Sequence, residues 1–219
     1  MPRGFSRIVD LPEIAPVFPL DGAILLPRAQ LPLNIFEPRY LNMIDDAMAG
    51  DRTIVMVQTA GGPKSLPKLA PVGGLGRITS FSETSDGRYL ITLTGVCRVT
   101  LGAELPATSP YRQCRLQYAA FEPDLTAPED DLAVFDRGRL MNALRSYLHH
   151  RQLDIDWETA EAAPPEPLVN SLSMALPFDP SAKQLLLEAP DLVRRTDALI
   201  ALLQIDAADP GDGEPPPMQ

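Results

Sequence analysis

Clusters of carboxylates are the first residues of this sequence that could do chemistry, as acid–base pairs or as metal ligands. Asp45 and Asp46 are adjacent, and Glu129, Asp130 and Asp131 form a second run. Neighbouring side chains on a helix point about 100° apart, so such runs do not converge on one proton or one ion. Acidic residues in a first helical turn also stabilise the helix dipole. We therefore interpret both clusters as solvated helix residues.

A serine nucleophile with a lysine base is a second possibility, because Lys64 and Lys68 lie on either side of Ser65. A lysine serves as such a base when burial lowers its pKa. The run from Thr59 to Pro71 is rich in glycine and proline, which predicts a hydrated loop and no catalytic dyad. Loops of this kind often carry contacts with partners. The candidate partner-contact residues are Lys64, Leu66, Lys68 and Leu69.

Metal and nucleotide chemistry have still less support. His149 and His150 are neighbours whose side chains diverge on a helix, and Cys97 and Cys114 fall in strand-like runs that predict buried free thiols. No GxxxxGK[ST] motif is present, since the glycines of VGGLGR have neither its spacing nor its lysine. The sequence therefore predicts no catalytic residue, no metal ligand and no cofactor-binding residue, hence no enzyme.

Five arginines on successive predicted strands favour a nucleic-acid binder: Arg77, Arg88, Arg98, Arg112 and Arg115. They could form one stripe across a sheet, or they could be separate outward charges that keep sheet edges from pairing. Residues 1–120 hold 12 basic and 10 acidic side chains, net +2, whereas residues 121–219 hold 7 and 19, net -12. Phosphate binding needs concentrated positive charge, so this balance argues against nucleic acid as the partner.

The composition is that of a soluble globular protein. The chain has 219 residues, 45% of them hydrophobic and 22% charged, with a formal net charge of -10. No run approaches the roughly 20 apolar residues of a membrane span, and the start MPRGFSR lacks the apolar stretch of a signal peptide. We expect a cytoplasmic protein without a membrane partner. The oligomeric state does not follow from the sequence.

The first half of the chain predicts short strands and one helix. The strand candidates are Val17–Leu20, Leu31–Phe36, Thr53–Gln58, Val72–Glu83, Arg88–Leu93, Val96–Leu101 and Arg112–Phe121. Ser85-Asp86-Gly87 predicts a hairpin with a type I′ turn. Pro38 suits the first position of a helix whose apolar residues recur at helical spacing up to Gly50. So many short strands indicate a barrel or a curled sheet.

The second half predicts about four helices. The first starts near Glu129–Asp131, the second runs from about Leu168 to Pro177, the third begins at Asp179-Pro180, and the fourth opens at Pro190. The acidic, proline-containing segment from Asp156 to Pro167 is predicted to be a linker. Residues 206–219 have no apolar periodicity, which predicts a disordered acidic tail.

Three stretches together resemble the substrate-binding domain at the N-terminus of Lon-type ATP-dependent proteases. They are Phe18–Val57, Val72–Val99 and Leu168–Arg195, with the blocks FPL, LPL, IFEPRY and LLEAPDL. The resemblance implies an α+β fold, a PUA-like β-barrel of about six to seven strands with one early helix, followed by a helical bundle. The expected domains are an arm (1–13), the barrel (14–121), the helical subdomain (122–205) and the tail (206–219).

The resemblance also implies a function. We expect a non-catalytic module that recognises unfolded polypeptide or a protein partner, with an RNA-binding PUA-like module as the alternative. The family motif comprises Phe36, Glu37, Pro38, Arg39 and Tyr40. Arg39 and Tyr40 could contact a peptide, but we favour a structural role in which Glu37 caps the helix, Tyr40 packs inward and Arg39 pairs with a carboxylate.

Overall fold

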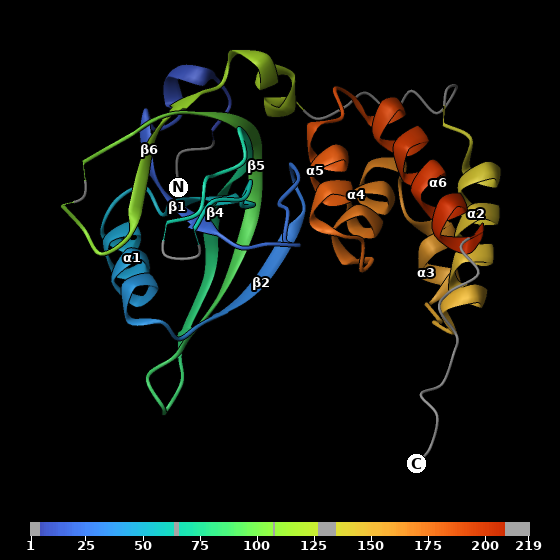
Figure 1. Ribbon diagram of the computed structural model, residues 1–219, viewed down its shortest axis with the longest axis horizontal. Helices are drawn as coiled ribbons and strands as arrows, with labels where there is room; N and C mark the ends of the chain where they lie inside the picture. Colours follow the sequence, from blue (N-terminus) through green and yellow to red (C-terminus); the bar gives the residue numbers. More distant parts are fainter. Residues whose placement is uncertain (1–4, 64–65, 107, 127–134, 209–219) are drawn as a thin grey trace. The chain divides into compact units, whose positions relative to one another are not determined.

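A six-stranded sheet is the main element of the computed structural model, which describes residues 5–63, 66–106, 108–126 and 135–208 (Figure 1). The strands are β1 (Ile14–Pro19), β2 (Gln30–Ile35), β3 (Thr53–Val57), β4 (Val72–Glu83), β5 (Tyr89–Glu104) and β6 (Arg112–Gln117). Their order is β2-β5-β4-β3-β1-β6, and β6 also pairs with β5. Five strands therefore form a closed hydrogen-bonded circuit, while β2 extends one side of β5. Only β1 and β3 pair in parallel within the described residues.

The prediction of two strands at Arg88–Leu93 and Val96–Leu101 is wrong, because both belong to the single long strand β5. The first part of β5 pairs with β2 and the last part with β6, while β4 follows most of its length. Gly95 lies between the two predicted strands, inside β5. It allows a close backbone approach, since a Cβ at Gly95 would lie 2.0 Å from the carbonyl oxygen of Leu26.

The segment before β2 is buried against the sheet through two glycines. Leu25 and Leu26 are fully buried. A Cβ at Gly74 of β4 would lie 2.0 Å from the Leu25 carbonyl oxygen, as a Cβ at Gly95 would from that of Leu26. Only glycine allows backbones to approach this closely. These two positions thus fix how the 20–29 segment lies on β4 and β5.

The predicted hairpin joins β4 to β5, but its turn is not type I′. Such a turn needs positive φ at both central residues, whereas only Gly87 has a positive φ here, of 78°. The amide of Gly87 donates to the Thr84 carbonyl at 3.0 Å, and the amide of Thr84 donates to the Arg88 carbonyl at 2.9 Å. The loop is therefore a three-residue connection in which glycine supplies the left-handed position.

Helix α1 (Pro38–Ala49) has the predicted bounds, with Pro38 first and Gly50 as the C-cap. Tyr40, Met43 and Ile44 are buried on its inner face and join an apolar cluster with residues of the sheet. The helix packs against β1 and β3. Its position places the Phe36–Tyr40 motif at the point where the chain leaves β2.

Five further helices follow: α2 (Arg137–Arg151), α3 (Trp157–Ala162), α4 (Pro165–Ala175), α5 (Pro180–Glu188) and α6 (Leu192–Ala208). The prediction of a linker from Asp156 to Pro167 is wrong, because this segment contains α3 and the start of α4. Asp156 caps α3 by accepting from the Thr159 amide at 3.1 Å. The predicted start of the first helix lies outside the described residues, as does 209–219 of the predicted tail, whereas residues 206–208 end α6.

The described residues form two compact units. The sheet unit comprises residues 5–126 and 170–188, and the helical unit comprises residues 135–169 and 189–208. The expected boundaries at 121/122 and 205/206 group the chain differently, because α5 and the last residues of α4 belong with the sheet. Gln184 shows why, since its side-chain amide donates to the Val72 carbonyl at the start of β4 at 3.0 Å.

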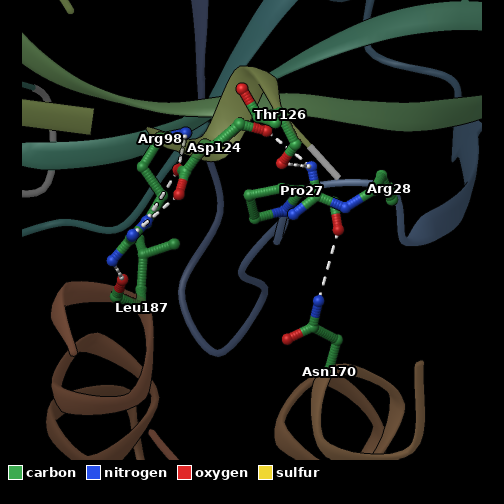
Figure 2. Close-up of polar contacts among 7 residues, drawn as sticks. All are labelled: Pro27, Arg28, Arg98, Asp124, Thr126, Asn170 and Leu187. Atoms are coloured by element: carbon green, nitrogen blue, oxygen red, sulfur yellow. Dashed lines mark hydrogen bonds and ion pairs between the residues drawn. The ribbon is translucent and has the colours of Figure 1, made fainter. Parts of the chain in front are cut away.

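A buried polar network holds the sheet unit together (Figure 2). The guanidinium of Arg98 on β5 faces the carboxylate of Asp124 in the 3-10 helix η2 (Ala119–Leu125), with Nε–Oδ2 and Nη2–Oδ1 distances of 2.8 Å. Arg98 also donates to the Leu187 carbonyl of α5 at 3.3 Å. Asn170 of α4 donates to the Pro27 carbonyl at 3.2 Å. These bonds connect α4 and α5 to β5 and to the segment before β2.

Candidate functional site

Two adjoining hollows of about 150 and 140 Å³ open on the sheet unit beside the start of α1. Both are lined by Leu66, Pro110, Tyr111 and Arg112. The first hollow is completed by residues of β1, α1 and the 59–71 loop, namely Val17, Pro19, Arg39, Tyr40, Thr59 and Pro67. The second is completed by residues of the segment between β5 and β6 and of these strands, namely Glu104, Leu105, Pro106, Ser109 and Gln113. We call the two hollows together the Leu66 groove.

The 59–71 loop is anchored on both sides of Leu66. The amide and the hydroxyl of Thr59 each donate to Oδ1 of Asp21 at 2.8 Å. The guanidinium of Arg112 donates to the Pro67 carbonyl at 2.7 Å and to Glu104 at 2.6 and 2.7 Å. Leu66 itself remains 60% exposed. The loop thus presents a large apolar side chain to solvent where the two hollows meet.

The structure places the predicted contact residues of this loop in different environments. Leu66 lines both hollows. Leu69 is partly buried, packs against a buried apolar cluster of the sheet and does not line the groove, so its contact with a partner stays a prediction. Lys68 is exposed but does not line the groove. Lys64 and its neighbour Ser65 lie outside the described residues.

The Phe36–Tyr40 motif places two side chains in the groove. The Tyr40 ring is buried 4.4 Å from the ring of Phe18, and the Arg39 guanidinium covers its other side at 4.5 Å from the ring centroid. Arg39 also pairs with Glu37 at 2.8 Å. Glu37 occupies the N-cap position without a side-chain capping bond, so the expectation that it caps the helix is wrong. Phe36 is 64% exposed and lies outside the groove lining.

The acidic pair on α1 has a structural role. The hydroxyl of Tyr111 donates to Oδ2 of Asp46 at 2.6 Å, and the hydroxyl of Tyr89 donates to Oδ1 of Asp45 at 3.0 Å. The two carboxylates thus serve different tyrosines, as expected for neighbours on a helix. Burial and the nearby Asp46 raise the pKa of Tyr111 to about 12. Tyr111 therefore stays a neutral wall of the groove at physiological pH.

A buried lysine beside a serine is a feature that the sequence analysis missed. Lys183 of α5 is 2% exposed, and burial lowers its pKa to about 8. Its Nζ donates to the carbonyls of Ser173 at 2.9 Å and Met174 at 2.6 Å. The Ser173 hydroxyl is fully buried and has no hydrogen-bond partner among the described residues. Lys183 therefore binds the last carbonyls of α4 and complements its dipole, an arrangement that leaves no substrate access to the serine.

Four of the five arginines contact other side chains of the sheet unit, and the fifth, Arg115, is exposed on β6. Arg98 is buried in its ion pair with Asp124, Arg112 pairs with Glu104 and Arg88 pairs with Asp86 at 2.8 Å. Arg77 lies over the ring of Phe5. Three of the guanidinium groups are thus neutralised by carboxylates, which leaves little concentrated charge for phosphates.

The described residues also lack a metal-binding cluster and a membrane-spanning helix. They contain no group of three or more histidine, cysteine, aspartate or glutamate side chains that could hold a metal ion. No described helix is long and apolar enough to cross a membrane. Cys97 and Cys114 are free and buried, and burial raises both thiol pKa values.

The candidate site is thus a groove between loops, and its described lining residues do not form a set of reacting groups. The chain belongs to the family of the ATP-dependent protease La (LON) substrate-binding domain, whose model matches residues 14–204. It is 26% identical over 203 residues to a Lon protease of Roseiflexus castenholzii, covering 89% of this chain and 24% of that protein. It is 28% identical over 93 residues to a Lon protease of Desulfosudis oleivorans, covering 41% of this chain and 11% of that protein. The chain thus spans a quarter or less of these relatives.

Two solved structures share the fold. A Lon N-terminal domain protein from Xanthomonas campestris superposes with a TM-score of 0.58 at 22% identity, covering 86% of this chain and 97% of that one. The N-terminal domain of the Mycobacterium avium complex Lon protease gives 0.60 at 17% identity, covering 87% and 97%. The family membership supports a role in substrate recognition.

Proposed function

We propose that this protein is a non-catalytic recognition module that binds unfolded polypeptide or a segment of a protein partner, as part of protein quality control. The family relationship supports recognition as the role. The described residues supply a surface for it but no nucleophile with an accessible base. A peptide held at this surface would be presented to other machinery, and no bond would be made or broken.

The observation that carries the proposal is the Leu66 groove. An apolar side chain that is 60% exposed lies between two hollows, on a loop whose Thr59 donates to Asp21 and whose Pro67 carbonyl accepts from Arg112. Exposed apolar surface beside concave, partly apolar walls is typical of sites that bind another molecule.

Site-specific photo-crosslinking tests this proposal. We replace Leu66 with a photoreactive phenylalanine analogue and irradiate the protein with a chemically unfolded, fluorescent client protein. The matched control carries the same analogue at Ile205, which is 68% exposed on α6 of the helical unit. We expect client adducts at position 66 in excess over position 205. Equal yields at the two positions, or adducts at neither, would contradict the proposal.

A further inference from the structure

The two hollows of the Leu66 groove are each large enough for one side chain. Their volumes are about 150 and 140 Å³. A cavity of roughly 150 Å³ holds a benzene molecule, so each hollow fits a phenylalanine ring or a leucine side chain. Neither hollow could take a whole folded element. The site thus has room for two large side chains and for the chain that joins them.

The hollows adjoin, since both use Leu66, Pro110, Tyr111 and Arg112 as walls. Alternate side chains of an extended chain point to the same side and are separated by about 7 Å. Residues i and i+2 of an extended segment therefore match two neighbouring hollows with a shared wall. Adjacent residues point to opposite sides and could fill only one hollow at a time.

The charges in the lining cancel in pairs. Arg39 of the first hollow is paired with Glu37 at 2.8 Å, and Arg112 is paired with Glu104 at 2.6 Å. The hydroxyl of Tyr111 is already committed to Asp46. An incoming charged side chain would lose hydration and find no unpaired counter-charge among the described lining residues. The groove is thus complementary to neutral, apolar side chains.

We propose that the Leu66 groove binds an extended polypeptide segment in which residues i and i+2 are large and apolar, one side chain in each hollow. This inference rests on the proposed function and adds the spacing that the bound segment must have. A segment with a single large apolar residue occupies one hollow only. A helical segment presents such residues at i+3 and i+4 and does not match the site.

Fluorescence anisotropy with labelled peptides tests the spacing on the full chain. The peptides share a serine- and threonine-rich background and carry one phenylalanine, or two at i,i+1, at i,i+2 or at i,i+3. Because burial of a second ring is worth a factor of about ten or more in affinity, we expect the i,i+2 peptide to bind at least about tenfold more tightly than the single-phenylalanine peptide. Equal affinities for all spacings, or tightest binding of the i,i+3 peptide, would overturn the inference.

A variant that blocks one hollow provides a second test of the inference. Leu105 lines the second hollow only. L105W should reduce the affinity for the i,i+2 peptide to about that for the single-phenylalanine peptide, which still has the first hollow. L90S, which alters an exposed leucine of β5 away from the groove, is the matched control and should change neither affinity. Loss of binding in L90S to the same extent as in L105W would refute the assignment.

The two proposals fail in different ways. If unfolded clients cross-link at position 66 but peptide spacing has no effect, the groove recognises polypeptide without the two-hollow rule, and only the inference is lost. If neither clients nor peptides bind at position 66, the proposed function itself is wrong at this site. Circular dichroism of each variant confirms that the compared proteins are folded.

Discussion

The guanidinium of Arg98 and the carboxylate of Asp124 form a bidentate pair, with two N–O distances of 2.8 Å and only 3% of Arg98 exposed. Asp124 also accepts from the Arg98 amide at 2.9 Å, so one carboxylate satisfies three donors of one residue. This pair joins β5 to η2 in the interior of the sheet unit. Removing either partner leaves a buried charge without compensation.

We therefore predict that D124A destabilises the protein by about 3–5 kcal/mol, because an unpaired buried guanidinium is costly. Urea denaturation followed by circular dichroism measures the change. The matched control is R88A, which breaks the exposed pair with Asp86 and should cost no more than about 1 kcal/mol. A loss of similar size in both variants would show that the buried pair is no more important than a surface pair.

This relationship could not be predicted from the sequence. Arg98 and Asp124 are 26 positions apart, and on a strand an arginine has the same pattern whether it points outward or inward. Features that depend on neighbouring residues were predicted more accurately. Pro38 and Gly50 delimit α1 correctly because a helix start and a helix end are decided by neighbouring residues. The Phe36–Tyr40 motif was also correctly located at a strand-to-helix junction. The partners of Arg39 and Glu37 could not be predicted, because they depend on side-chain geometry.

Proline accounts for the late start predicted for α4, at about Leu168 instead of Pro165. Pro164, Pro165 and Pro167 suggested a linker, yet proline is compatible with the first turn of a helix, where its missing N–H leaves no bond unmade. Likewise, nothing local distinguishes Leu66 from Leu69. Only the fold decides that Leu66 is exposed while Leu69 packs against a buried cluster.

Lys183 gives a prediction about pH. Its pKa is lowered from 10.5 in the unfolded chain to about 8 in the folded protein by burial. Between pH 8 and 10.5 the unfolded state therefore binds more protons, so the lysine makes the unfolding free energy rise with pH, by at most about 1.4 kcal/mol per pH unit. Below pH 8 both states are protonated and this slope disappears.

We expect K183M to lose this slope, so the stability of the natural protein relative to K183M should increase between pH 8 and 10. Urea unfolding of both proteins at several pH values gives the difference. Tyrosines and cysteines titrate in the same range, but they are common to both proteins and cancel. A difference that stays constant over this range would show that Lys183 has an ordinary pKa in the folded state.

Gly95 and Gly74 make a steric prediction. A Cβ at either position would lie 2.0 Å from a backbone carbonyl oxygen, of Leu26 or Leu25. G95A should therefore displace the 20–29 segment and destabilise the protein by more than about 3 kcal/mol, above the usual cost of overpacking. G50A is the matched control, because the nearest atom there is 3.6 Å away. Thermal unfolding of both variants measures the contrast, and similar melting temperatures would contradict the close approach.

Cys97 gives the last prediction, on thiol reactivity. Burial, with a contribution from Asp124, raises the pKa of its thiol to about 12 from an ordinary value of 9.0. The thiolate is the reactive form, so at pH 8 its fraction falls by a factor on the order of 10³ relative to an unfolded chain. Burial also raises the pKa of Cys114. We expect both thiols to react with an aromatic disulfide reagent only after unfolding, at rates limited by opening of the sheet unit.

C97A and C114A, each with one thiol left, assign the signal. Rapid labelling of either single-thiol protein under native conditions would show that its cysteine is accessible and ionised, contrary to the structure.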